Sequence, residues 1–308
     1  MDAAVCRFAV TVLLAACAAL VPATSARAWG AKGHRLTALI AEQLLAPSAR
    51  AQVKLILGSE GLADAALYLD IHRDELQQQI HGSKDWHFDD RPSCDAAAPI
   101  SDYCPDGQCA SFQLKRHQRD LSFSQGPLAE RRFALRVVAH LAGDIHQPLH
   151  TADHDDSGGN GIRLSGPWLP SGKHGPNLHS VWDKDFVALA LAVPAFQGKA
   201  ERQVAALLAS QITDDEKSRW RKGPVSQWMK QSYDLAVKLA YSPLPGFACA
   251  AEGFAAQALT LPESYVTQAV ASIPEQLKKG GLRLAAMLNR ALSSAADAAG
   301  PWVRVDKL

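Results

Sequence analysis

The chain has 308 residues, of which 32 are basic and 31 acidic, so its formal net charge at pH 7 is +1. A nearly neutral protein does not attract polyanions through its net charge, so any nucleic acid or phosphate ligand would need a local site. Hydrophobic residues make up 47% of the sequence, which is enough for one substantial core.

Residues 1–28 have the pattern of an export signal. Arg7 supplies the positive charge, an apolar run follows it, and Ala26-Arg27-Ala28 is a small-x-small cleavage site. The apolar run is too short for a comfortable membrane span, and no other stretch of the sequence approaches one. We therefore expect a secreted or periplasmic protein without a membrane anchor, whose single mature domain, residues 29–308, begins at Trp29.

Helical periodicity dominates the mature chain, because apolar residues recur every three or four positions. We predict helices over these ranges: Lys32–Leu45, Pro47–Leu57, Leu62–Leu69, Arg131–Ile145, Leu178–Ala192, Gln203–Ile212, Ser226–Leu239 and Ser264–Ala298. The last range contains Pro274 and Gly280-Gly281, so we expect a broken helix there. Alternation typical of a strand is limited to Gly161–Leu164, and long loops are expected over Phe88–Ser111 and Thr151–Pro176. The sequence therefore predicts one mostly α domain.

Four cysteines remain after signal cleavage: Cys94, Cys104, Cys109 and Cys249. An even number in an exported chain indicates two disulfide bonds, because export exposes cysteines to oxidising conditions. Three pairings are possible. Cys104 and Cys109 bracket the turn sequence P-D-G-Q and could close a small loop, which would leave Cys94 to reach Cys249. Their irregular spacing disfavours a zinc site built from these cysteines.

The segment from His140 to His150 reads H-L-A-G-D-I-H-Q-P-L-H. His140 and Asp144 lie four residues apart, so on a helix they share one face with Cβ atoms about 5–6 Å apart. His150 follows Gln147-Pro148, where the proline should distort or end the helix. Imidazole and carboxylate groups gathered so densely are the ligands that Zn²⁺ prefers.

A second pair, His179 and Asp183, repeats the four-residue spacing in the sequence N-L-H-S-V-W-D. Each pair has a structural alternative, which is ordinary packing of a polar helix face. The recurrence of the same two ligand types on apolar helices favours metal binding over that alternative.

Other polar residues could complete such a site or serve only the fold. A freed amino group at Trp29 has a pKa near ~8 and can bind a metal together with its own carbonyl oxygen, and His34 follows five residues later. The alternative is a frayed terminus beside a solvated histidine. Asp70 and Arg73 also fit an ion pair on a helix face, and His87, in D-W-H-F-D-D, also fits a core histidine.

The remaining histidines lack such partners. By helical geometry His146 points away from His140. We therefore expect it to have a structural role, or to contact a metal ligand without binding the metal itself. We expect the others to lie at the surface: His72, His81, His117, His154 and His174.

The motifs occur in a specific order: a Trp-Gly mature terminus, G-H, D-x-x-R, W-H-F, H-x3-D-x5-H and N-L-H-x3-D. This order resembles the zinc-dependent single-strand-specific nucleases of fungi, plants and bacteria, relatives of the bacterial zinc-dependent phospholipases C. The resemblance spans Trp29 to about Cys249. It implies a mostly α, single-domain, multi-helix phospholipase C/nuclease-like fold with long loops and three bound Zn²⁺. It also implies two disulfides, Cys94 with Cys249 and Cys104 with Cys109.

The residues that match the family's ligands form three sets, one for each zinc: Asp70, His87, His140 and Asp144; the amino group and carbonyl oxygen of Trp29 with His34 and Asp144; and His150, His179 and Asp183. Asp144 belongs to two sets and would bridge two metals. Because the Trp29 amine is free only after cleavage, the resemblance makes signal removal a part of activation.

Two features favour the nuclease branch over the phospholipase branch. In the phospholipases the last ligand of the third zinc is a glutamate, whereas the fourth residue after His179 here is Asp183. Phe88 and Asp90 directly follow His87 and match the nuclease base pocket, in which a ring stacks on a base and a carboxylate accepts hydrogen bonds from the base edge. Stacking contributes ~1–3 kcal/mol per base. Simple core packing is the alternative role for Phe88.

The resemblance implies an endonuclease that hydrolyses single-stranded DNA and RNA to 5′-phosphorylated products and removes 3′-phosphates from nucleotides. Asp70 would orient the attacking group, and Arg73 would hydrogen-bond the phosphate in the transition state. No obligatory protein partner is evident. The alternatives are a zinc-dependent phospholipase C, a phosphatase for other phosphomonoesters and a zinc-binding protein without activity.

Overall fold

The computed structural model describes residues 29–123, 125–166, 169, 176–249 and 257–293. Helices account for most of these residues and strands for few, which confirms the predicted mostly α, single-domain fold. The predicted signal peptide and the position of His174 lie outside the described residues. None of the described helices combines the length and apolar character needed to cross a membrane.

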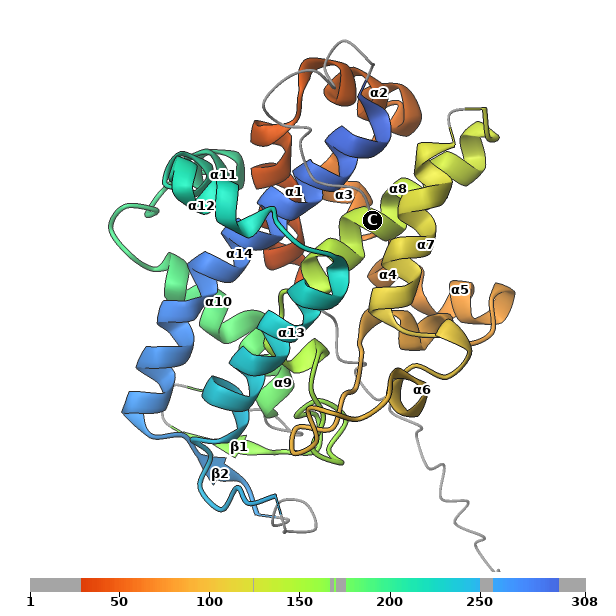
Figure 1. Ribbon diagram of the computed structural model, residues 1–308. Helices are drawn as coiled ribbons and strands as arrows, with labels where there is room; N and C mark the ends of the chain where they lie inside the picture. Colours follow the sequence, from red (N-terminus) through yellow and green to blue (C-terminus); the bar gives the residue numbers. More distant parts are fainter. Residues whose placement is uncertain (1–28, 124, 167–168, 170–175, 250–256, 294–308) are drawn as a thin grey trace, which may run out of the picture.

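Two helices form the centre of the molecule. Helix α1 (Ala31–Leu44) runs beside the long helix α14 (Glu263–Leu292), drawn in blue in Figure 1. Leu36, Leu39 and Ile40 are buried on α1, as expected for apolar residues three and four positions apart. Among the further helices that α14 contacts are α2 (Pro47–Leu57), α7 (Ala110–Ser122), α8 (Leu128–Asp144) and α10 (Phe186–Leu191).

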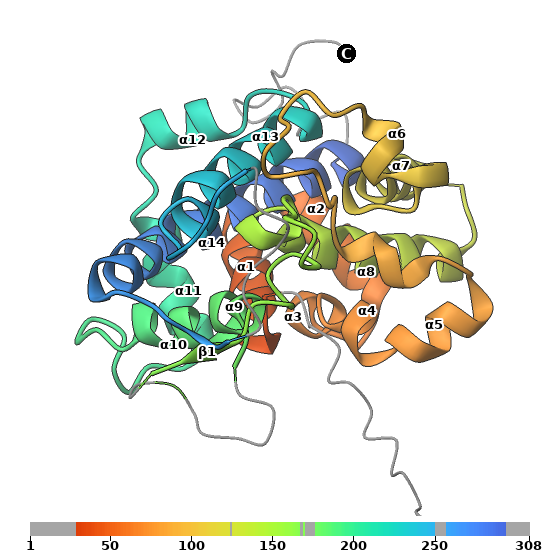
Figure 2. The ribbon, with the colours of Figure 1, turned by 90° about the horizontal axis from the view of Figure 1, so that it is seen from below.

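Short helical turns connect α2 to α7. In chain order they are α3 (Leu62–Ala65), α4 (Tyr68–Ile71), α5 (Arg73–Gln79), η1 (Ser83–His87), α6 (Ile100–Tyr103) and η2 (Pro105–Gly107). Helices α3 and α4 both pack against α8, which places residues near position 70 beside the C-terminal half of α8. Seen from below, α9 (Leu178–Ser180) lies beside α1, and α4 lies beside α8, with α3 between α9 and α4 (Figure 2).

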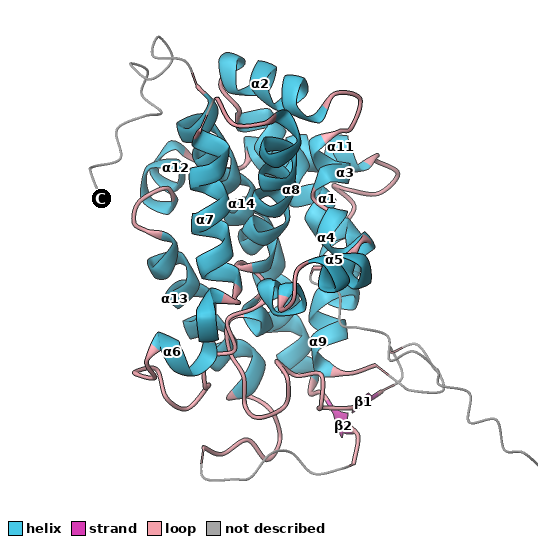
Figure 3. Cartoon of the chain, turned by 90° about the vertical axis from the view of Figure 1, so that its right-hand side faces the viewer, coloured by secondary structure: helices cyan, strands magenta, loops and turns pink. Residues whose placement is uncertain are grey.

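The second half of the chain alternates short and longer helices. Its remaining elements are η3 (Pro148–His150), β1 (Leu164–Ser165), η4 (Val181–Asp185), α11 (Glu201–Ser210), α12 (Asp214–Trp220), α13 (Val225–Leu235), η5 (Ala236–Tyr241) and β2 (Leu259–Thr260). The two strands pair in parallel, Leu164 opposite Leu259 and Ser165 opposite Thr260. They lie among loops at one end of the molecule (Figure 3).

Several predicted helices agree with the structure, but the predicted helix Leu62–Leu69 is divided into α3 and α4, and the expected break in the last helix was wrong. The helix predicted from Ser264 is continuous to Leu292 and is not broken at Pro274, although proline lacks the N–H that a helix interior uses. Burial of this helix against its neighbours stabilises it beyond what local preference predicts. The predicted end of this helix, residues 294–298, lies outside the described residues.

The loop predictions were correct only in part. Helix α6 and turn η2 lie inside the loop predicted over Phe88–Ser111, and α7 begins at Ala110. The predicted strand Gly161–Leu164 is displaced, because β1 comprises Leu164 and Ser165.

The fold carries two disulfides. The structure pairs Cys94 with Cys249 and Cys104 with Cys109, as the family resemblance implied.

Candidate metal centre

Eight histidine and aspartate side chains from seven helical elements converge in the interior. Each is at most 8% exposed. Their positions are His34 in α1, Asp70 in α4, His87 at the end of η1, His140 and Asp144 in α8, His150 at the end of η3, His179 in α9 and Asp183 in η4. They form three groups that could each hold a metal ion, of which the first two share His140: His34, Asp70 and His140; His87, His140 and Asp144; and His150, His179 and Asp183.

Asp144 belongs to the second group and also approaches His34 of the first. Its Oδ1 is 3.2 Å from Nε2 of His34. Its Oδ2 is 3.2 Å from Nδ1 of His87 and 3.2 Å from Nε2 of His140. The two carboxylate oxygens therefore face different imidazoles, which is the arrangement that a bridging carboxylate requires. Asp70 is more distant, with Oδ1 at 3.9 Å from Nε2 of His140.

The third group has its own local supports. Nε2 of His179 is 3.4 Å from Oδ2 of Asp183, and Nε2 of His150 is 3.9 Å from Oδ1 of Asp183. Helix α9 is held at its start by Asn177, whose side chain accepts the Ser180 N–H. The following residues, Val181–Asp185, form a π-helical turn, a rare element that is frequent at functional sites.

Backbone carbonyls orient three of the imidazoles. Nδ1 of His140 donates to the Ala66 carbonyl at 2.7 Å, Nδ1 of His150 to the His87 carbonyl at 2.8 Å, and Nδ1 of His179 to the Gly158 carbonyl at 2.6 Å. Each ring therefore turns Nε2 toward the cluster, as metal-binding histidines do when a second group fixes the tautomer.

Gly158 must be glycine for this support to exist. Its φ is +62°, and a Cβ there would lie 2.6 Å from the Leu149 carbonyl oxygen. A larger residue would displace the carbonyl that holds His179.

Burial and neighbouring charges set the pKa values of the imidazoles. Burial lowers the pKa of four of them, to about 3 for His150 and about 4 for His179, with a lowered pKa also for His34 and His87. His140 differs: burial opposes its protonation, but the charge and hydrogen bond of Asp144 raise its pKa to about 9.

The carboxylates respond in opposite directions. Burial opposes the ionisation of Asp144, but His140, His34 and His87 together hold its pKa well below the usual value. Burial raises the pKa of Asp183 well above the usual value, and the hydrogen bond from Gln147 opposes that rise.

A bound cation fits these residues. Nε2 of His150 and Nε2 of His179 face each other at 3.1 Å, and two lone pairs at that distance repel unless a proton or a cation lies between them. The lowered pKa values of both rings disfavour the proton. One oxygen each of Asp70, Asp144 and Asp183 is buried without a hydrogen-bond partner. Imidazole nitrogens and carboxylate oxygens are together a suitable donor set for Zn²⁺.

Trp29 lies beside the cluster. Its side chain is fully buried against Gly33 and approaches Gly143, the residue that His34 also contacts. The Gly30 N–H donates to the Asp183 carbonyl at 3.0 Å, which holds the segment close to the third group. Binding of a metal by the Trp29 amine remains a prediction.

Arg73 lies near the third group. Its guanidinium donates to the Lys84 carbonyl at 3.1 Å, and its charge contributes to the lowered pKa of His179.

A cavity of about 490 Å³ lies beside the centre. Its lining includes Phe88, Asp90, Tyr103, Asp153 and His154, so the two residues expected to form a base pocket face the same space. The Phe88 ring is 6.4 Å from the His150 ring. Burial, with the charges of Asp153 and other aspartates, raises the pKa of Asp90 to about 7.

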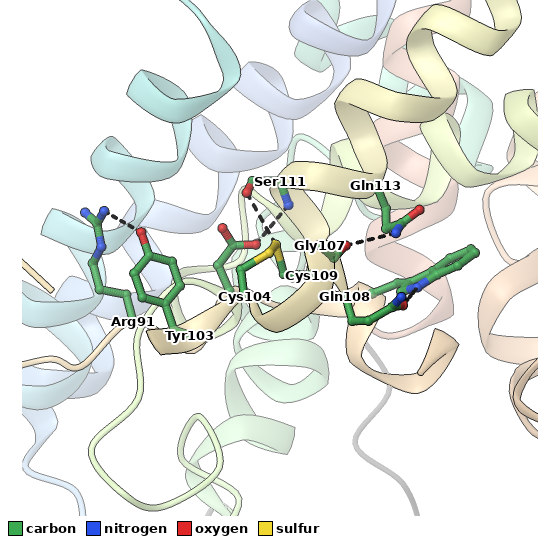
Figure 4. The surroundings of a disulfide bond; sticks show 10 residues. Arg91, Tyr103, Cys104, Gly107, Gln108, Cys109, Ser111 and Gln113 are labelled. Carbon is green, nitrogen blue, oxygen red and sulfur yellow. Dashed lines mark hydrogen bonds between the residues drawn. A yellow bond between two sulfur atoms is a disulfide. The ribbon is translucent and has the colours of Figure 1, made fainter. Parts of the chain in front are cut away.

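Both disulfides support this cavity. Cys94 and Cys249 belong to its lining. Cys104 and Cys109 close the loop that carries Gln108, and Tyr103 directly precedes this loop, as Figure 4 shows. Gln108 is held by the Trp86 indole N–H at 2.7 Å.

Two histidines predicted at the surface are placed differently. His117 is 6% exposed and lies 5.6 Å from the Trp86 ring and 5.5 Å from the Phe133 ring. It is buried because it continues the face of α7 that carries Leu114. His154 is half-buried, 2.9 Å from the Ser93 hydroxyl.

The sequence reasoning missed one polar residue of the centre. Gln147 is fully buried and donates to Oδ1 of Asp183 at 2.8 Å. Its position between the ligand candidates Asp144 and His150 was the available signal. His146, by contrast, points away from the cluster as predicted and contacts Arg283.

Comparisons with known proteins agree with this arrangement. The model of the S1/P1 Nuclease family matches residues 29–293. Endonuclease 1 of Arabidopsis thaliana is 27% identical over 299 residues, which covers 89% of this chain and 90% of that protein. Nuclease S1 of Aspergillus oryzae is 27% identical over 277 residues, covering 85% and 91%. Nuclease P1 of Penicillium citrinum is 27% identical over 275 residues, covering 85% and 97%.

Proposed function

The chain belongs to the S1/P1 nuclease family, and on that premise we propose that it is an exported zinc-dependent endonuclease for single-stranded DNA and RNA. We further propose that it has 3′-nucleotidase activity and releases 5′-phosphorylated products. The observation that carries the proposal is the buried His/Asp cluster beside a cavity that contains Phe88 and Asp90.

Three zinc ions would be held by the three predicted ligand sets. The split contacts of Asp144, with Oδ1 toward His34 and Oδ2 toward His87 and His140, support its role as a bridge. The close approach of His150, His179 and Asp183 supports the third site. When bound, zinc would lower the pKa of a water molecule and offset negative charge on the phosphate.

The protein's own side chains would position the reactants. Asp70 would accept a hydrogen bond from the attacking water, since its buried Oδ1 has no hydrogen-bond partner. Arg73 would donate to the phosphate oxygens, where charge grows during the reaction, with the planar fork that suits phosphate. The water would attack phosphorus from the side opposite the 3′-oxygen. The bond between phosphorus and the 3′-oxygen would then break, and the phosphate would stay on the 5′-oxygen of the product.

The cavity would confer the preference for single strands. Phe88 would stack on one base, and Asp90 would accept hydrogen bonds from its edge. A base in a duplex must leave the stack to reach this cavity, which costs free energy for unstacking and unpairing. A base in a single strand largely avoids this free-energy cost.

Export would follow from the signal sequence and would complete the centre. Cleavage before Trp29 would free the amine proposed as a ligand of the second zinc. The buried position of Trp29 beside Gly33 and the Gly30–Asp183 hydrogen bond support a terminus that is held at the cluster.

The test measures zinc content and hydrolysis of a single-stranded oligonucleotide on one signal-cleaved sample, with and without a chelator. We expect about three zincs per chain and 5′-phosphorylated products that disappear with chelation. His179→Ala should lose activity and one zinc, whereas exposed His81→Ala should lose neither.

Two other outcomes would identify different proteins. Zinc binding with turnover of phosphatidylcholine, and not of the oligonucleotide, would identify a phospholipase C. Zinc binding without phosphate release from any of these substrates would identify a non-catalytic protein.

A further inference from the structure

The short turn between α8 and η3 connects two parts of the candidate metal centre. Asp144 ends α8 and His150 ends η3, so the turn Ile145–Gln147 sets the distance between them. In the proposed function these two residues serve different metals. The position of the turn therefore affects the geometry of the whole centre.

The side chain of Gln147 is locked in one orientation. It is fully buried, and its Oε1 accepts the Leu149 N–H at 2.6 Å. Because a backbone N–H can only donate, this contact identifies the oxygen and leaves the amide nitrogen as the other end. That nitrogen donates to Oδ1 of Asp183 at 2.8 Å.

The contact with Gln147 makes the two oxygens of Asp183 unequal. Oδ1 has the amide as its partner, whereas Oδ2 is buried without a hydrogen-bond partner, 3.4 Å from Nε2 of His179. A locked donor on one oxygen of a carboxylate leaves the other oxygen as the free acceptor.

The turn itself is anchored from the side away from the metal centre. His146 donates from Nδ1 to the Ala142 carbonyl at 2.8 Å, so its Nε2 accepts from the Arg283 guanidinium at 2.8 Å. The Ser232 hydroxyl donates to the Ile145 carbonyl at 2.6 Å. Helices α13 and α14 thereby hold the turn at both residues that precede Gln147.

Arg283 is an unusual anchor. It is 1% exposed, donates to the Trp220 carbonyl at 2.9 Å and lies 4.9 Å from the centre of the Trp228 ring. Among the described residues no carboxylate forms an ion pair with it. Burying a cation without an ion pair costs free energy. We therefore expect Arg283 to have a role that an apolar residue could not fill, which is to hold the turn through His146.

We infer that Gln147 is a positioning residue of the metal centre, whose amide binds Oδ1 of Asp183 and so selects Oδ2, the oxygen that faces His179. The inference rests on the proposed zinc-dependent function and deepens it. The amide, held by Leu149 and by the anchored turn, keeps Oδ2 of Asp183 directed to the third metal.

Two variants separate the donor from the shape of the side chain. Gln147→Leu removes the amide. Gln147→Glu keeps its size and an acceptor for Leu149 but replaces the donor with a negative oxygen facing Asp183. Gln113→Leu is the matched control, because Gln113 is 1% exposed and also donates to a protein oxygen, the Gly107 carbonyl at 2.9 Å, away from the ligands.

The experiment measures the affinity for each Zn²⁺ by competition with a chromogenic chelator, together with Tm before and after zinc removal. Both Gln147 variants should bind one of three zincs about 10–100-fold more weakly, the usual loss when a supporting hydrogen bond to a ligand is removed. The stabilisation by zinc should shrink in both variants, and the Gln113 variant should bind zinc like the wild type.

Wild-type zinc affinities in either Gln147 variant would overturn the inference. A Tm after zinc removal that is close to the wild-type value shows that the variant still folds. If the wild type itself binds no zinc or cleaves no single strand, the proposed function fails instead, so the two failures are distinguishable.

Discussion

Replacing Asp144 by asparagine tests the bridge at the centre of the cluster. Asparagine keeps the size of the side chain but removes its charge and one of its two acceptor oxygens. The two ligand sets that share Asp144 then lose their common ligand, whereas the third set is unchanged. We expect Asp144→Asn to retain about one zinc where the wild type retains about three, and to lose nuclease activity.

The stability that the zinc-free variant loses can be worked out from the pKa of His140. Burial opposes protonation of this ring, but Asp144, followed by Asp70 and the Ala66 carbonyl, raises its pKa from 6.5 to about 9. One pKa unit corresponds to about 1.4 kcal/mol, so the raised pKa, in which Asp144 has the largest share, corresponds to about 3 kcal/mol of the free energy of unfolding. This agrees with the ~3–5 kcal/mol expected when one partner of a buried ion pair is removed.

The sign of the pH dependence is defined by the raised pKa. Because the pKa of His140 is higher in the folded state than in the unfolded state, the contribution is complete below about pH 6.5 and disappears as the pH rises through about 9. Asp144→Asn should therefore lower the free energy of unfolding by about 3 kcal/mol near pH 6 and by much less near pH 10.

The assays are elemental analysis for zinc and urea denaturation of the chelator-treated protein across this pH range. Asp120→Asn is the matched control, since Asp120 is half-exposed and lies 3.4 Å from a different histidine, His117. The control should keep all its zinc. An Asp144→Asn protein with the zinc content of the wild type would refute the bridge, and a pH-independent loss of stability would refute the pairing with His140.

Three further predictions concern single side chains. Arg73→Ala should keep its zinc and lower kcat on a single-stranded oligonucleotide by about 10²–10³-fold, and a normal kcat would remove Arg73 from the mechanism. Phe88→Ala should raise KM about tenfold with little change in Tm, whereas a large fall in Tm at unchanged KM would assign the ring to core packing. Burial lowers the pKa of His117 to about 4, so the wild type should lose about 3 kcal/mol as the pH falls from about 6.5 to 4. Denaturation of His117→Gln over the same range should show a flatter profile, and parallel profiles would contradict this origin.

Local patterns predicted much of the fold. The predicted helix Pro47–Leu57 coincides with α2, and the prediction Lys32–Leu45 differs from α1 by one residue at each end. Helix α7 was missed because its apolar face is narrow and includes His117 among charged neighbours. Its burial depends on contact with α8, which no local pattern contains.

Motif spacing predicted part of the candidate site for a simple reason. Residues four apart on one helix lie on one face, so the spacing alone indicates that His140 pairs with Asp144 and His179 with Asp183. The spacing could not indicate which oxygen of Asp144 faces which imidazole, or that Gln147 holds Asp183. Those contacts depend on how the turn after α8 is packed.

The sequence by itself determined the helical class, the even set of cysteines and the ligand types, because each follows from residue identity and short-range spacing. Only the tertiary structure decided which oxygen of Asp144 faces His34, that the disulfides support the cavity, and that His117 is buried. The physical reason is that such contacts join residues far apart in the chain. They form when packing of whole helices buries apolar surface, and that packing is a property of the complete fold.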